Sequence, residues 1–167
     1  RSAETSDRPG DALWLPGVVM LALAPSVETY AAIAEVAMPT PVLSGLLAAV
    51  AVWVAASAAA CALGTVQRLP GVQALTILMT FGGIALAIIA SELVADDQWP
   101  PFVNLRTLVF MTCVGALVAE SRLMAVSERM DGSDESGVAA APALAVAAAL
   151  LALWPLTKEI FVTFLWT

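Results

Sequence analysis

Long uncharged stretches alternate with short charged ones along the chain, and this pattern predicts helices that cross a membrane. No charge occurs in residues 12–27, in residues 36–67 or between Arg68 and Glu92. A helix needs about 20 predominantly apolar residues to cross the hydrocarbon core of a bilayer. The pattern therefore predicts an all-α, polytopic transmembrane helix bundle with about five spans, at approximately 13–37, 41–63, 72–94, 104–126 and 137–164.

Polar segments and helix-ending residues divide the chain further. Residues 1–12 form a polar N-terminal segment, and residues 13–167 form a single transmembrane helical domain. Pro41 suits the first turn of the second span, and Gly64 is the residue expected to cap its C-terminus. Residues 127–137 (SERMDGSDESG) show no apolar periodicity, so they predict a flexible cytoplasmic loop before the last span.

The fourth span has the shortest charge-free stretch, which covers only residues 107–119. Arg106 precedes this stretch, and Glu120 and Arg122 follow it. Long charged side chains at the ends of a span can extend toward the headgroups while their stems stay in the apolar region. We therefore expect Arg106 at one membrane interface and the Glu120/Arg122 pair at the other.

Composition agrees with a membrane protein and excludes several other classes. Hydrophobic residues make up 60% of the chain and charged residues 13%, with a mean hydropathy of +0.90, whereas a soluble domain carries about 25% charged residues. A net charge of −7 argues against nucleic-acid binding. The chain has no histidine, so it lacks the commonest zinc ligand and the usual axial ligand of haem. We expect no metal and no cofactor, and bound lipid is the ligand class that suits such a surface.

The two cysteines predict packing rather than redox chemistry. Cys61 and Cys113 lie inside apolar runs and do not form a Cys-x-x-Cys motif. Free cysteines in such surroundings behave as small apolar side chains.

Lysine and arginine positions predict the orientation, because cytoplasmic loops of membrane proteins are enriched in these residues. With a cytoplasmic N-terminus and five spans, two basic residues fall on the outer side, Arg106 and Lys158. Five fall on the cytoplasmic side: Arg1, Arg8, Arg68, Arg122 and Arg129. We therefore expect a multi-pass protein of the inner (cell) membrane, with its N-terminus cytoplasmic and its C-terminus outside.

This topology places several polar residues at helix ends on the outer face, where they form one candidate cluster. A buried charge is costly unless it is paired, and Arg106 is the only arginine on that face. We expect Arg106 to pair with at least one of the glutamates; the alternative is that each residue is separately hydrated among the headgroups. The cluster consists of Glu28, Glu92, Asn104, Arg106 and Glu159.

The order of short motifs along residues 13–166 resembles a known repeating unit. A span ends at a glutamate, a basic turn (Gln67-Arg68-Leu69-Pro70) follows the next span, Asn104-Leu105-Arg106 opens the fourth, and Leu156-Thr157-Lys158-Glu159 closes the last. The chain is similar to the repeat of a large bacterial family of uncharacterised multi-spanning membrane proteins, classed as a domain of unknown function. Those proteins carry many such units, and the resemblance implies a helical membrane fold without implying an activity.

Three functional classes fit these observations. A non-catalytic structural or accessory subunit of a larger membrane complex fits best, because we see no catalytic residue pattern and small residues suited to helix contacts recur four apart. Its partners would be the lipid bilayer and other membrane subunits. A small transporter or channel component is the alternative. The third class is a membrane enzyme acting on a lipid-linked substrate at the outer face, with Glu28, Glu92 or Glu159 as general base and Arg106 binding phosphate.

Overall fold

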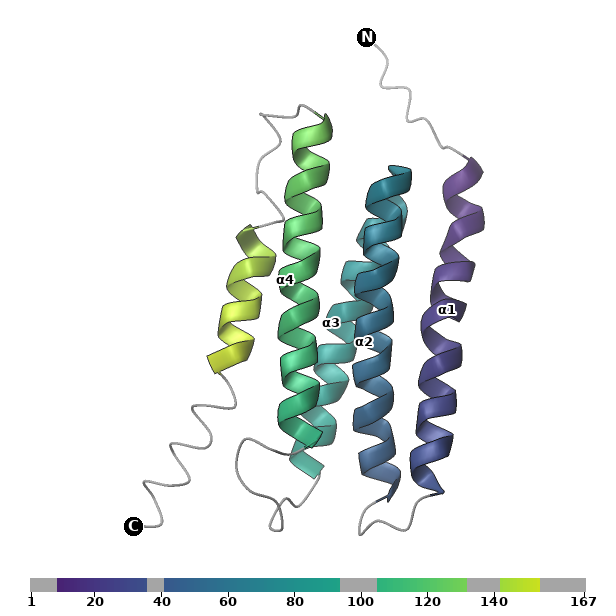
Figure 1. The fold of residues 1–167 in the computed structure, drawn as a ribbon, viewed down its shortest axis with the longest axis vertical. Coiled ribbons are helices and arrows are strands. Elements are labelled where there is room, and N and C mark those ends of the chain that lie inside the picture. The colour runs from purple at the N-terminus through teal and green to yellow at the C-terminus, as the bar shows by residue number, and fades with distance from the viewer. Residues whose placement is uncertain (1–8, 36–40, 94–104, 132–141, 154–167) are drawn as a thin grey trace.

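The protein is a bundle of antiparallel helices (Figure 1). The computed structural model describes residues 9–35, 41–93, 105–131 and 142–153, and within them all regular structure is helical. The long helices are α1 (Pro9–Ala34), α2 (Pro41–Gln67), α3 (Pro70–Leu93) and α4 (Leu105–Asp131). A shorter apolar helix, the C-terminal helix, covers Pro142–Leu153. The prediction of an all-α helix bundle is confirmed.

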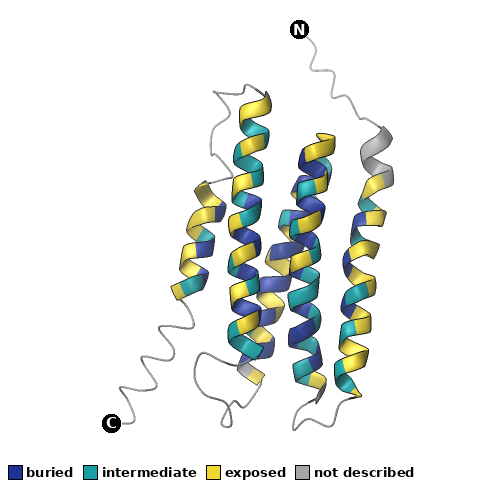
Figure 2. Ribbon diagram, viewed as in Figure 1, coloured by how far each residue is buried: buried dark blue, intermediate teal, exposed yellow. Residues whose placement is uncertain are grey.

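Helix α2 lies at the centre of the bundle. It packs against α1, α3 and α4, and α3 also contacts α4 and α1. Among the described helices α1 and α4 make no contact with each other, and they lie on opposite sides of α2 (Figure 1). Buried residues face the centre of the bundle and exposed ones face outward (Figure 2). The interior is therefore formed mainly by α2, α3 and α4.

The outer surface of the bundle is apolar, as expected for helices that contact lipid. Four helical stretches are long and apolar enough to cross a membrane: Trp14–Ala34, Val42–Gln67, Pro70–Ser91 and Leu105–Met130. Large apolar side chains point outward from all four, such as Met20 (63% exposed), Val66 (75%), Leu78 (68%) and Leu108 (61%). Monomeric water-soluble proteins rarely expose a continuous apolar surface of this extent, because its contact with water is unfavourable. The chain is an integral membrane protein with multiple spans. Only residues 142–153 of the expected fifth span are described as helical, and the rest of that span lies outside the described residues.

The turn between α2 and α3 differs from the prediction. Helix α2 continues past Gly64 to Gln67, and Arg68 ends it with a positive φ of 54°. The amide of Leu69 donates to the Gly64 carbonyl (2.8 Å) and that of Arg68 to the Thr65 carbonyl (3.3 Å), which are the two bonds of a Schellman motif. The prediction of Gly64 as the cap was wrong. Gly64 is small for another reason: a Cβ there would lie 3.1 Å from Val72 at the start of α3.

Helix α4 is also longer than predicted. It continues to Asp131, so residues 127–131 of the expected flexible loop are helical, and the rest of that loop lies outside the described residues. The extra turn places Ser127 against α3, where its hydroxyl accepts a hydrogen bond from the Gln73 side chain (3.3 Å). The polar composition of residues 127–131 is typical of a loop, but in the structure this turn is helical and one of its side chains, Ser127, packs toward α3.

Glycine lets α2 and α3 approach closely near their middle. A Cβ on Gly83 would lie 2.5 Å from Val54 and 3.2 Å from Trp53, whereas one on the neighbouring Gly82 would meet nothing within 4 Å. At the same crossing, the indole Nε1 of Trp53 donates to the Met79 carbonyl (3.0 Å). The Gly82-Gly83 pair therefore marks a helix crossing, with Gly83 as the residue that requires it.

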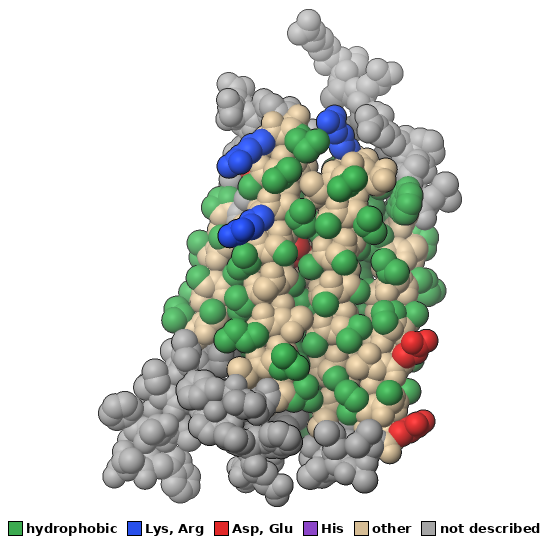
Figure 3. Space-filling view, in the orientation of Figure 1, with side chains coloured by type: hydrophobic (Ala, Val, Ile, Leu, Met, Phe, Trp, Pro, Cys, Tyr) green, Lys and Arg blue, Asp and Glu red, His purple; other side chains and the backbone are tan. Residues whose placement is uncertain are grey.

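Charged residues collect at opposite ends of the bundle. The end of α2, the start of α3 and the end of α4 lie together at the upper end in Figure 1, and basic side chains gather toward that end in Figure 3. Arg68 and Arg129 lie at or near these helix ends. Glu28 lies in the C-terminal part of α1, and Glu35 comes directly after that helix, toward the opposite end of the bundle. We call these the upper end and the lower end. That the upper end is cytoplasmic stays a prediction.

Candidate functional site

Glu120 is the one acidic or basic side chain that the described residues enclose completely, with 0% of its surface exposed. It follows the start of α4 by about 22 Å and precedes its end by about 16 Å, at a rise of about 1.5 Å per residue. It therefore lies well inside Leu105–Met130, the stretch of α4 long and apolar enough to span a membrane, and the bundle encloses it; its position at an interface stays a prediction. Arg122, two residues later and about 200° around the helix, is exposed.

The Glu120 carboxyl has one partner from α3. The Thr80 hydroxyl donates to Oε1 over 2.6 Å, and Thr80 is itself 0% exposed. The other oxygen, Oε2, is buried and accepts no hydrogen bond from the described part of the chain. A buried polar atom without a partner is costly in an apolar interior. The site thus holds a carboxyl whose hydrogen-bonding capacity is half used.

Other polar side chains line up with Glu120 in a continuous row, which we call the polar seam. On α2, α3 and α4 its members recur three, four or seven positions apart, so on each helix they share the face that points into the bundle. Seven of its eight members, Glu120 included, are buried, and only Ser127 is partly exposed. The polar seam consists of Ser57, Cys61 and Thr65 on α2, Gln73, Thr76 and Thr80 on α3, and Glu120 and Ser127 on α4.

Hydrogen bonds join the three helices at the upper part of the seam. Gln73 Nε2 donates to the hydroxyl of Thr65 on α2 (3.0 Å) and to that of Ser127 on α4 (3.3 Å). Thr65 in turn donates to the Cys61 carbonyl (2.9 Å). Below this level, Cys61 on α2 and Thr76 on α3 are both buried, with 0% exposure, between Gln73 and Glu120. The seam therefore runs from the carboxyl toward the α2–α3 turn.

Below Glu120 the interior changes to apolar. Buried residues on α2, α3, α4 and the C-terminal helix form one hydrophobic cluster there, and Cys113 lies within it, two turns before Glu120 on α4. We call it the apolar plug; its largest members are Leu47, Val54, Ile84, Val109, Phe110 and Leu117. The surroundings of Glu120 are thus asymmetric, with hydroxyl and amide groups on one side and hydrocarbon on the other.

Of the predicted outer-face cluster, the structure describes the side chains of Glu28 and Arg106. Glu28 is exposed on α1, while Arg106 opens α4 and donates from its guanidinium to the Ser91 carbonyl on α3. Helix α2 separates these two residues (Figure 1). The pairing of Arg106 with a glutamate stays a prediction, because the side chains of the other members lie outside the described residues: Glu92, Asn104 and Glu159.

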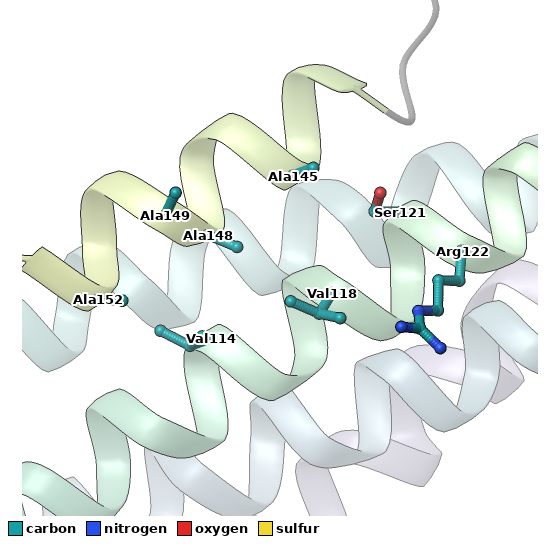
Figure 4. A pocket seen from close by; sticks show the side chains of 8 residues that line it. All are labelled: Val114, Val118, Ser121, Arg122, Ala145, Ala148, Ala149 and Ala152. Atoms are coloured by element: carbon teal, nitrogen blue, oxygen red, sulfur yellow. The ribbon is translucent and has the colours of Figure 1, made fainter.

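A surface groove of about 330 Å³ separates α4 from the C-terminal helix. Alanines of the C-terminal helix face valines of α4 across it (Figure 4). Such a surface suits a lipid chain, and bound lipid stays a prediction. The lining residues are Val114, Val118, Ser121 and Arg122 on α4, and Ala145, Ala148, Ala149 and Ala152 on the C-terminal helix.

Comparisons with protein-family models, curated proteins and solved structures found no match to this chain. The resemblance to the multi-spanning repeat family therefore stays a prediction, and the candidate site rests on the geometry of Glu120 and the polar seam.

The sequence contains a signal for this site in its uncharged polar residues, which an analysis of charged positions alone does not consider. Gln73, Thr76 and Thr80 lie at spacings of three and four, which places them on one face of an otherwise apolar helix. Pairing that face with the charge at the end of the apolar stretch of α4 would have suggested a buried Glu120.

Proposed function

We propose that this chain is a proton-translocating component of a membrane transport protein, in which Glu120 binds and releases the proton inside the membrane. The observation that carries the proposal is a completely buried carboxyl with one oxygen bonded to Thr80 and the other without a partner among the described residues. Ionisable residues inside membrane spans are rare, and they commonly mark ion pathways and proton relays.

A purely structural role would not call for this carboxyl. An alanine or leucine at position 120 would pack against apolar neighbours without any polar group to desolvate. Polar and ionisable groups inside the membrane favour a transport role over a structural one, and the polar seam and Glu120 supply such groups.

A proton is the ligand that this donor set suits. Divalent cations such as Ca²⁺ take six to eight oxygen ligands, and Mg²⁺ takes six in octahedral geometry. No three His, Cys, Asp or Glu side chains gather among the described residues, and Glu120 is the only carboxylate in the seam. A proton needs one carboxylate oxygen, and Oε2 is buried without a hydrogen-bond partner among the described residues.

Proton flux across liposomes containing the purified chain tests the proposal. With a pH gradient and a dye trapped inside, the wild-type chain should dissipate the gradient faster than protein-free liposomes do. Glu120→Gln should abolish this difference, since the amide can still accept from Thr80 but cannot release a proton at any ordinary pH. Glu28→Gln is the matched control, because it makes the same substitution at an exposed site on α1 and should leave the flux unchanged.

Two outcomes would overturn the proposal. One is a wild-type flux equal to that of protein-free liposomes. The other is a Glu120→Gln variant that folds, as judged by circular dichroism and gel filtration, and conducts like the wild type.

The accessory-subunit interpretation retains one specific observation. Ala55 and Ala59 are exposed and four residues apart on α2, so a helix of another protein could approach closely there. Co-purification at a fixed stoichiometry, lost in Ala55→Leu/Ala59→Leu but kept when Leu78 is changed to Ala, would support it. Recovery of the chain alone from gently solubilised membranes would count against it.

A further inference from the structure

We infer that Glu120 exchanges protons with water at the upper end of the bundle only, through the polar seam, while the apolar plug separates it from the lower end. This inference rests on the proposed function of Glu120 and adds the direction from which the proton arrives.

The seam is long enough to connect the carboxyl with the end of the bundle. Ser127 follows Glu120 by seven residues and Gln73 precedes Thr80 by seven, which is about 10 Å along each helix. From there Thr65 is only two residues from the end of α2, and Gln73 is three residues into α3. The polar seam therefore extends from Glu120 to the α2–α3 turn at the upper end of the bundle.

Groups along the seam can bind water in a chain. The hydroxyl of Thr65 donates to the backbone carbonyl of Cys61, and that of Thr76 to the backbone carbonyl of Gln73, each about one turn earlier in its own helix (2.9 Å each). Each hydroxyl oxygen still has a lone pair to offer after donating its own hydrogen. Buried water requires two to four polar partners, and hydroxyl, thiol and amide groups from three facing helices provide them. Water that enters transiently at the Gln73 level can thus relay a proton to Oε2.

The opposite direction offers no comparable partners until the far end of α3, where Ser91 is buried and donates to the Ile88 carbonyl (2.8 Å), and Arg106 donates to the Ser91 carbonyl. Toward the lower end, the inward positions next along α3 are Ile84, Ala87 and Ala90, and α4 places Phe110 and Cys113 against them. All are buried, at 8% exposure or less. Among these side chains only the Cys113 thiol can bind water, and it does so weakly, so a water molecule there lacks the two to four polar partners it requires and the space stays dry. The carboxyl is therefore accessible from one side in this conformation.

The two native cysteines report on the two sides. Cys61 belongs to the polar seam, and Cys113 belongs to the apolar plug. Both are free thiols with 0% exposure, so their static accessibility is the same. Only transient hydration distinguishes them, and the thiol hydrogen exchanges with D₂O when water reaches it.

The experiment is infrared measurement of S–H to S–D exchange in the full chain in lipid, using Cys113→Ser to isolate Cys61 and Cys61→Ser to isolate Cys113. We expect Cys61 to exchange at least about tenfold faster than Cys113, because exchange of buried groups follows local opening rather than static burial. Equal rates, or faster exchange at Cys113, would overturn the inference.

A second variant tests whether the seam is the route. Gln73→Leu replaces the amide at the upper part of the seam with hydrocarbon and should slow both Cys61 exchange and proton flux. Thr112→Val is the control, since that hydroxyl bonds within its own helix to the Leu108 carbonyl (2.9 Å), outside the seam. If Glu120→Gln abolishes flux while Gln73→Leu changes neither flux nor exchange, the access route is wrong and the proposed function stands. If Glu120→Gln leaves flux unchanged, the proposed function is wrong whatever the cysteines show.

Discussion

The hydrogen bond between Thr80 and Glu120 should contribute measurably to stability, and Thr80→Val tests this directly. Valine keeps the branched shape of threonine but removes the hydroxyl that donates to Oε1 over 2.6 Å. Among the described residues the carboxyl would then have no partner at either oxygen. Leaving a buried acceptor unsatisfied costs about 1–3 kcal/mol in soluble proteins, whereas side-chain hydrogen bonds within a membrane average about 0.6 kcal/mol and reach about 1.7.

Because both residues are fully enclosed, we expect a value near the upper membrane figure, a loss of about 1–2 kcal/mol in the free energy of unfolding. The assay is reversible unfolding in mixed micelles at increasing SDS, followed by tryptophan fluorescence. Glu120→Leu serves as the second arm of a double-mutant cycle, and in that background Thr80→Val should cost almost nothing, since the acceptor is gone. Thr112→Val is the control, expected within about 0.5 kcal/mol of the wild type. A coupling energy within about 0.3 kcal/mol of zero would refute the placement of Glu120 against Thr80.

Four further predictions follow from the same geometry. Gly83→Ala should lower the free energy of unfolding by about 1–3 kcal/mol, since its Cβ would lie 2.5 Å from Val54, while Gly82→Ala, with open space around it, should be neutral or stabilising; equal effects in thermal melts would contradict the helix crossing. Arg68→Gly should raise the unfolding free energy by about 0.5–1 kcal/mol, because glycine adopts a φ of 54° without strain, and a decrease would count against the cap. Glu120→Gln should abolish proton flux that Glu28→Gln leaves intact, as measured in liposomes. The Cys61 thiol should exchange its hydrogen with D₂O before the Cys113 thiol does.

Local sequence predicted the helices well and their ends less well. The uncharged runs from Pro41 and from Pro70 led to α2 and α3 directly, because a long apolar run in lipid must satisfy its backbone hydrogen bonds within a helix. The end of α2 was misplaced since Gly64 resembles a cap in sequence. The structure uses Gly64 for a close approach to α3 and lets Arg68 adopt the left-handed conformation instead.

The candidate site illustrates the limit of counting charges. Glu120 and Arg122 look alike as markers of a span end, yet one is enclosed and the other exposed. Their two-residue separation turns them to opposite sides of α4, and the helix continues past both to Asp131. Which of the two points inward depends on Thr80 in a different helix, so no window of sequence around residue 120 contains the answer.

The sequence by itself determined that this is a helical membrane protein with multiple spans and where the four long helices lie along the chain. These properties depend on how much apolar length lies between charges, which is a local quantity. Tertiary structure alone decided which face of each helix points inward. In helices that are apolar all round, surrounded by lipid that is equally apolar, hydrophobicity does not select an inner face. Close packing at Gly83 and hydrogen bonds between helices, such as Thr80 to Glu120, select it instead, and in doing so they place a carboxyl inside the membrane.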